Sequence, residues 1–127
     1  DGEYFIQLKQ QIKDANGKVL GTPARIGRRT GVIQVSKTQF EAFTIPMRMA
    51  ILLHEFSHFY LNEKMDDEME ADLNGLLIYL GLGYPRIEAY QAFLETFKNA
   101  PSNLNKKRYD MINNFINNFE KMDIVIK

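Results

Sequence analysis

Beyond residue 44, apolar residues recur every three or four positions along the chain, which is the period of an α-helix. Four such stretches cover residues 45 to about 62, about 67 to 80, 86 to about 98, and 102 to about 122. Turn-forming residues separate them, since Gly81 and Gly83 follow the second stretch and Pro101 follows the third. The pattern therefore predicts four helices joined by short connections.

The first 43 residues are less regular. Residues 31–36 are rich in β-branched side chains, which predicts a strand. Residues 18–27 are predicted to be extended, at a sheet edge or in a loop, because Pro23 has no backbone N–H to donate. Residues 37–43 are predicted to form a short helix or turn. Together these elements predict an α+β fold that is mostly helical, with a small N-terminal β-sheet.

Residues 3–14 allow two interpretations. Their apolar residues stand at helical spacing and end before Asn16-Gly17, which predicts a short amphipathic helix with an Asn/Gly stop. Asn-Gly is also the strongest short signal for a β-hairpin turn, so a hairpin at this point is the alternative. The apolar residues concerned are Tyr4, Phe5, Leu8 and Ile12.

Composition bounds the class of protein. A chain of 127 residues with 45% hydrophobic and 25% charged residues is typical of one globular domain, here residues 1–127. The formal net charge is zero, so we expect neither a nucleic acid nor a membrane as partner. The chain has no cysteine, which excludes disulfides and thiolate metal sites. With no secretory signal or membrane-spanning segment, we expect a cytoplasmic or otherwise intracellular location, and the start at Asp1 fits a fragment of a longer chain.

The only two histidines lie four residues apart in the first predicted helix, which is apolar nearly all round. Positions i and i+4 share one helix face, so His54 and His58 can reach the same metal ion, and Zn²⁺ suits imidazole ligands. Glu55 is offset by about 100° around the helix, where it can contact a water on the metal. In a buried helix these groups are costly unless paired or metal-bound. The H-E-x-x-H spacing therefore predicts a zinc-dependent peptidase with Glu55 as general base.

A catalytic zinc needs a third protein ligand, and a carboxylate must supply it because no third histidine or cysteine exists. Glu68, Glu70 and Asp72 stand at the start of the next predicted helix, which a short connection brings back beside the first. Glu68 and Asp72 share a face, so we favour Glu68 as the ligand and Asp72 as the acceptor of a ligating imidazole N–H. Glu70 is the alternative ligand.

The sequence His-Glu-Phe-Ser-His at 54–58, followed by Glu-Met-Glu-Ala-Asp at 68–72, resembles the gluzincin metallopeptidases. It is most similar to the minigluzincins and to the catalytic domains of CAAX-prenyl-protease-type peptidases, over about residues 31–80. The resemblance implies a zincin-like domain with an edge strand beside the active-site helix. That strand would bind an extended peptide or protein substrate by β-augmentation. The residues concerned are Val32, Ile33, Gln34 and Val35.

Two features of the family pattern are missing. The transmembrane helices of its membrane members are absent, and no downstream histidine can stabilise the transition state. Tyr84 and Arg86 are candidates for that oxyanion role. The apolar tail at 124–126 is a candidate to occupy the cleft in an inactive precursor. One alternative function is a catalytically silent zinc- or peptide-binding module within a larger assembly, and another is a helical domain with a coincidental motif.

Overall fold

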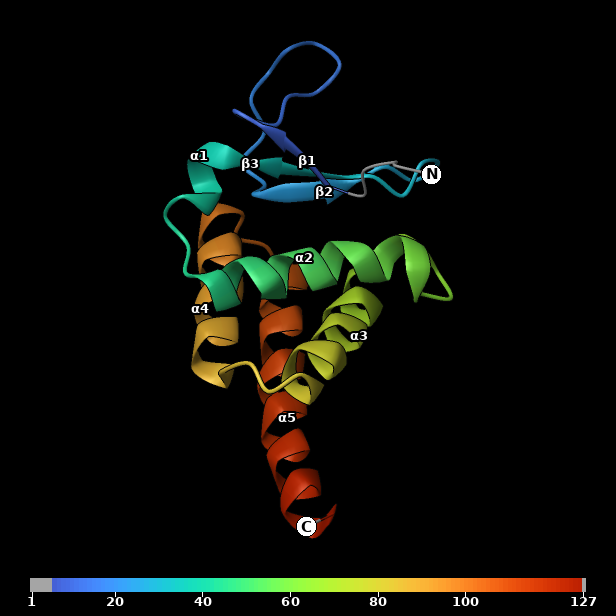
Figure 1. Cartoon of the computed structure of the whole chain (residues 1–127), viewed down its shortest axis with the longest axis vertical. Coiled ribbons are helices and arrows are strands. Elements are labelled where there is room, and N and C mark those ends of the chain that lie inside the picture. Colours follow the sequence, from blue (N-terminus) through green and yellow to red (C-terminus); the bar gives the residue numbers. More distant parts are fainter. Residues whose placement is uncertain (1–5, 127) are drawn as a thin grey trace.

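The computed structural model describes residues 6–126, with side chains described for residues 6–119. Within that range the chain is an α+β fold with five helices and a three-stranded mixed sheet (Figure 1). The elements in chain order are β1 (Ile6–Lys9), β2 (Ala24–Ile26), β3 (Ile33–Ser36), α1 (Lys37–Phe40), α2 (Ile45–Tyr60), α3 (Glu68–Gly81), α4 (Arg86–Asn99) and α5 (Asn103–Ile126).

The four long helices confirm the predictions made from periodicity, and the starts of α2 and α5 are capped as the sequence indicates. The Thr44 side chain accepts a hydrogen bond from the Met47 N–H at 3.2 Å, and Ser102 accepts one from the Asn105 N–H at 3.0 Å. Helix α5 continues to Ile126, farther than expected. The prediction that the tail at 124–126 occupies the cleft concerns side chains outside the described range.

The predicted N-terminal helix is wrong for the part of it that the structure describes. Residues 6–9 form β1, which pairs in parallel with β3, so non-local backbone pairing overrides the local helical spacing. The apolar residues Tyr4 and Phe5, on which that interpretation also relied, lie outside the described residues. The alternative hairpin is confirmed, because the Leu20 N–H donates to the Ile12 carbonyl at 2.8 Å and Gly17 adopts a φ of 82° in the turn.

The strand order in the sheet is β1-β3-β2, which corrects the expectation that residues 32–35 form an edge strand. Strand β3 is central, since β1 pairs with one side of it and β2 runs antiparallel along the other. The sequence prediction failed because β1 was interpreted as a helix, which left the sheet one strand short. The edges of the sheet are therefore β1 and β2.

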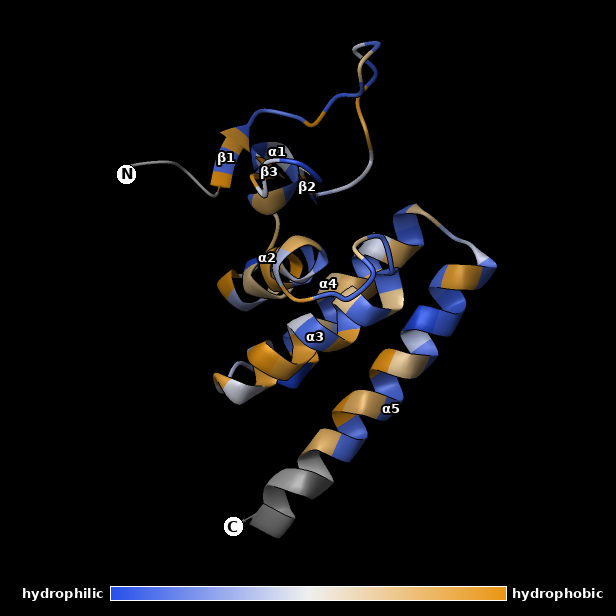
Figure 2. Ribbon diagram, turned by 90° about the vertical axis from the view of Figure 1, so that its right-hand side faces the viewer, coloured by the Kyte–Doolittle hydropathy of each residue, from blue (hydrophilic) through white to orange (hydrophobic). Residues whose placement is uncertain are grey.

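Helix α2 lies at the centre of the molecule. The sheet covers one side of it and the other long helices lie on the opposite side, while α5 extends past them (Figures 1 and 2). Ile33 and Val35 of the sheet are buried, as are Ile51 of α2 and Leu76 of α3. At the crossing of α2 and α3, a Cβ added to Gly75 would lie 3.0 Å from the backbone nitrogen of His54. Only glycine allows the two helices to approach this closely.

Candidate metal centre

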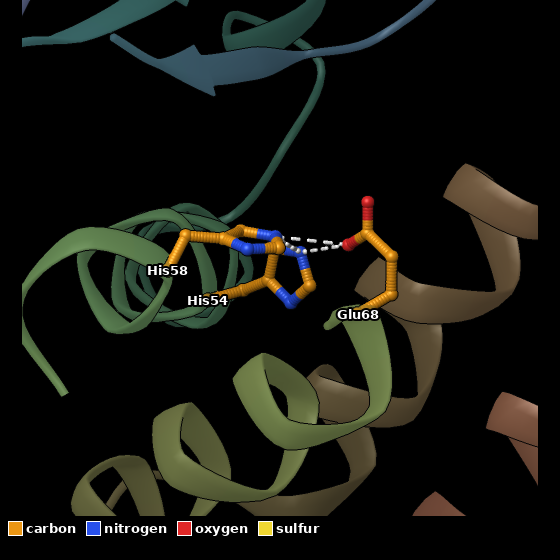
Figure 3. A group of neighbouring side chains, drawn as sticks. All are labelled: His54, His58 and Glu68. Carbon is orange, nitrogen blue, oxygen red and sulfur yellow. Dashed lines mark hydrogen bonds and ion pairs between the residues drawn. The ribbon is translucent and has the colours of Figure 1, made fainter. Parts of the chain in front are cut away.

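Three side-chain atoms from α2 and α3 converge on one point (Figure 3). The Nε2 atoms of His54 and His58 lie 3.2 Å apart, and Oε1 of Glu68 lies 3.0 Å from the first and 2.9 Å from the second. Ligand atoms about 2.0–2.2 Å from one zinc ion in a tetrahedral arrangement stand about 3.3 Å apart. The two imidazoles and the carboxylate therefore match such a metal site in donor type and in spacing, and the group could hold a metal ion.

Each imidazole is oriented through its second nitrogen. His58 donates from Nδ1 to the backbone carbonyl of Met65 at 2.6 Å, which leaves the lone pair of Nε2 available to a metal. Nδ1 of His54 lies 2.9 Å from Oδ1 of Asp72, an ion-pair distance at an angle outside hydrogen-bonding geometry. These two contacts turn both Nε2 atoms toward the same point.

The site carries more acid than base. Glu55, Glu68 and Asp72 contribute three carboxylates, and among the ion pairs of the described residues Arg108 brings a guanidinium to Glu68 and Asp72. Burial alone would lower the pKa of His54, but contacts with Asp72 and Glu68 outweigh it and raise that pKa to about 10. Burial opposes ionisation of Glu68, yet both histidines hold its pKa below the ordinary range. The site thus attracts positive charge, either a proton on His54 or a divalent cation, which compete for the same atoms.

Glu55 stands beside the converging atoms without joining them. Its Oε2 lies 3.7 Å from Nε2 of His54, its side chain is 12% exposed, and burial raises the pKa of its carboxyl. It opens into a cavity of about 100 Å³ together with Glu68. The remaining walls come from the segment before β2 and from α2, α4 and α5: Thr22, Pro23, Ile51, His54, Phe93, Thr96 and Arg108.

No known protein family, curated protein or solved structure matches this chain. None of its helices, over the range where the structure describes them, has the length and apolar character needed to cross a bilayer.

The structure separates the two candidate third ligands. Glu68 lies against both histidines, whereas the Glu70 carboxylate accepts the backbone N–H groups of Glu63 and Lys64 at 2.8 and 3.1 Å. Glu70 therefore fixes the connection between α2 and α3 rather than facing the site. The two carboxylates diverge because positions i and i+2 of a helix point about 200° apart.

Tyr84 and Arg86 lie away from the site, which corrects their expected role as oxyanion stabilisers. They follow the C-terminal end of α3, and Glu68 is at its other end, about 20 Å away for a helix of this length. The Tyr84 ring instead stacks on Tyr79 at 5.2 Å between centroids, and the Tyr79 hydroxyl donates to the Pro85 carbonyl at 2.5 Å. They were predicted near the site only because they directly follow, in the chain, the helix that carries Glu68.

Arg108 is the residue of the site that the sequence analysis missed. It is 8% exposed, and the sequence analysis gave it no role in the site. A signal did exist, because Arg108, Ile112 and Ile116 follow each other at intervals of four residues and so share the buried face of α5. A lone cation on an apolar helix face requires a partner, which here is Asp72 of α3.

Proposed function

We propose that this chain is a zinc-dependent endopeptidase of the gluzincin type, with a zincin-like arrangement of its sheet and helices. One observation carries the proposal: Nε2 of His54, Nε2 of His58 and Oε1 of Glu68 converge within 3.2 Å, while the Glu55 carboxylate opens to the same cavity. The resemblance of segments 54–58 and 68–72 to the gluzincin motif pair supports it.

Two imidazoles and one carboxylate suit Zn²⁺, which when bound activates a water as nucleophile and polarises a carbonyl. With zinc held by His54, His58 and Glu68, the Glu55 carboxylate would accept a proton from a water and would then donate it to the leaving amine. Its buried environment raises the pKa of the carboxyl, which brings the group closer to the working pH of a general acid and base.

The substrate path is better matched by β2 than by the strand expected from the sequence. β2 is an edge strand, and Thr22 and Pro23, directly before it, line the cavity that contains Glu55. An extended peptide running along this edge would pass over Glu55 and place its scissile carbonyl near the zinc ligands. Ile51 and Phe93 supply an apolar wall for one small side chain of the substrate.

A specific observation also favours the alternative of a silent zinc- or peptide-binding module. Among the described residues that line the cavity there is no tyrosine, and the one histidine is the proposed ligand His54. Arg108 is the remaining cation there, and its guanidinium is bonded to Asp72. Thr22 and Thr96 also line the cavity, but their hydroxyls donate to backbone carbonyls. Every described side-chain donor named in this cavity is thus already engaged, and a developing oxyanion has no evident donor there.

The decisive experiment combines metal content with cleavage. We expect one zinc per chain by mass spectrometry, cleavage of unfolded casein by the wild type, and full zinc but no cleavage in Glu55→Gln. Glu95→Gln makes the same chemical change on the exposed face of α4, away from this cavity, and should leave both unchanged. Zinc without cleavage in the wild type would support the silent module, and a wild type without zinc would overturn both functions.

A further inference from the structure

Arg108 links the C-terminal helix to the metal centre. Its Nε donates to Oδ2 of Asp72 at 2.7 Å and its Nη2 donates to Oδ1 at 2.9 Å. The two buried groups therefore form a bidentate salt bridge. Nη1 donates to Asn105 at 3.0 Å, and the guanidinium lies 4.8 Å over the ring of Phe97. Four contacts therefore hold the guanidinium in one orientation.

Asp72, which is 1% exposed, connects Arg108 to the proposed metal ligands. The Oδ1 atom that accepts from Arg108 is also the atom 2.9 Å from Nδ1 of His54. Nη2 of Arg108 lies 3.7 Å from Oε1 of Glu68, the oxygen that meets both histidines. One side chain of α5 thus stands behind two of the three ligands.

We propose that Arg108 is a positioning residue for the metal centre, which sets metal affinity by holding Asp72 against His54. The proposal deepens the proposed function and rests on its metal site, but it does not require peptide cleavage. It also makes the docking of α5 part of the site, although α5 supplies none of the three ligand atoms.

The direction in which metal affinity changes when Arg108 is removed distinguishes a positioning role from electrostatic repulsion of the metal. A guanidinium near the site repels a cation, so its removal would strengthen metal binding if charge alone mattered. If Arg108 acts by positioning, its removal weakens metal binding. The buried carboxylate of Asp72 would lose its guanidinium donors and would turn away from His54. Partners that orient a metal ligand typically contribute 10- to 100-fold in metal affinity.

The test is zinc affinity, measured by competition with a chelating dye on the full chain. We expect Arg108→Gln to bind zinc about 10- to 100-fold more weakly than the wild type. Arg108→Lys keeps the charge and the contact with Phe97 but lacks the fork, so it should also bind more weakly. It is the more conservative variant if Arg108→Gln does not fold. Unchanged or tighter binding in the folded variants would overturn the proposal.

Two further variants distinguish positioning from general loosening of α5. Asp72→Asn should weaken zinc binding by a similar factor, and the double variant with Arg108→Gln should be little weaker than either alone, since both act on one contact. Ile112→Val trims a fully buried α5 residue one turn from Arg108 and should leave zinc affinity unchanged. Additive losses in the double variant, or an equal loss in Ile112→Val, would count against positioning.

These outcomes remain separate from those of the proposed function. If the wild type binds zinc but cleaves no peptide, and the Arg108 variants bind zinc more weakly, the positioning role is supported and the peptidase function is refuted. If the wild type cleaves peptides and the Arg108 variants bind zinc as tightly as the wild type, the peptidase function stands and the positioning role is refuted. A wild type that binds no zinc removes both.

Discussion

The two ends of α3 both bury polar side chains, but they do so in opposite ways. At the C-terminal end, Tyr79 is fully buried, and its hydroxyl is satisfied by the Pro85 carbonyl while its ring stacks on Tyr84. At the N-terminal end, Glu68 and Asp72 lie against the two histidines, and Arg108 forms an ion pair with Asp72. The polar group at the C-terminal end has its partner within the chain, whereas the group at the N-terminal end could hold a metal ion.

This difference shows what distinguishes a site from a structural contact. Burial of a polar group is common to both ends, so burial alone indicates nothing about function. The N-terminal end differs because three atoms that can bind a metal lie about 3 Å from one another, an arrangement that costs free energy unless a proton or a cation lies between them. The following predictions test that contrast in order of decreasing effect.

The largest effect is expected when a metal ligand is removed. Zinc at a hundredfold excess over its Kd should stabilise the wild type by about 2.7 kcal/mol in urea unfolding. His58→Ala should lose this stabilisation almost entirely, because its Nε2 is one of the three converging atoms. Tyr79→Phe, which alters the other end of α3, serves as the control and should keep it. An equal zinc response in all three proteins would show that zinc binds elsewhere.

A smaller effect is expected where α3 crosses α2. Gly75→Ala places a methyl group 3.0 Å from the backbone of His54 and should force the helices apart, at a cost of about 1–3 kcal/mol in unfolding free energy. Zinc affinity should fall as well, because the same displacement moves His54 away from Glu68.

Gly81→Ala is the matched control at the C-terminal end of the same helix, where an added Cβ meets nothing within 4 Å. It should be neutral or slightly stabilising, because alanine favours the helix more than glycine does. The measurement is urea unfolding combined with zinc titration. Equal behaviour of the two alanine variants would refute close packing at Gly75.

Removing the hydroxyl of Tyr79 should affect stability but not the metal. Tyr79→Phe loses one hydrogen bond and should unfold about 1 kcal/mol more easily, with unchanged zinc affinity. Burial raises the pKa of Tyr79 to about 12 from its ordinary value of 10. The folded phenol therefore keeps its proton longer than the unfolded one, so wild-type stability should fall between pH 10 and 12. That fall should be weaker in Tyr79→Phe, as unfolding followed at several pH values would show.

The smallest effect is expected for the residue that the sequence placed at the site. Tyr84→Phe should leave both zinc affinity and casein cleavage unchanged, because the ring lies at the far end of α3 and stacks on Tyr79. A loss of cleavage with zinc retained would return Tyr84 to the oxyanion role and would contradict the contrast between the two ends.

Local patterns in the sequence were enough to predict the four long helices and the three residues that converge at the candidate metal centre. The i, i+4 spacing fixes His54 and His58 on one face, and a short connection brings Glu68 back to them. The choice of Glu68 over Glu70 followed from the same helical geometry. These features depend on residues close together in the chain, where periodicity is informative.

The features that the sequence did not reveal depend on distant pairing. Strand β1 forms because residues 6–9 pair with residues 33–36, and no local signal outweighed their helical spacing. Arg108 meets Asp72 from 36 positions farther along the chain, and only the course of α5 brings them together. Zinc binding and peptide cleavage stay predictions, because both depend on species other than this chain.

The bond from His58 to the carbonyl of Met65 has a consequence for how such a site tolerates change. The acceptor is a main-chain atom, so any amino acid at position 65 offers the same oxygen. A substitution scan through this connection would therefore miss it. Insertion or deletion of a single residue between 61 and 67 would move the carbonyl and release the ring. The hydrogen bond therefore constrains the length of segment 61–67 and not the identity of its amino acids.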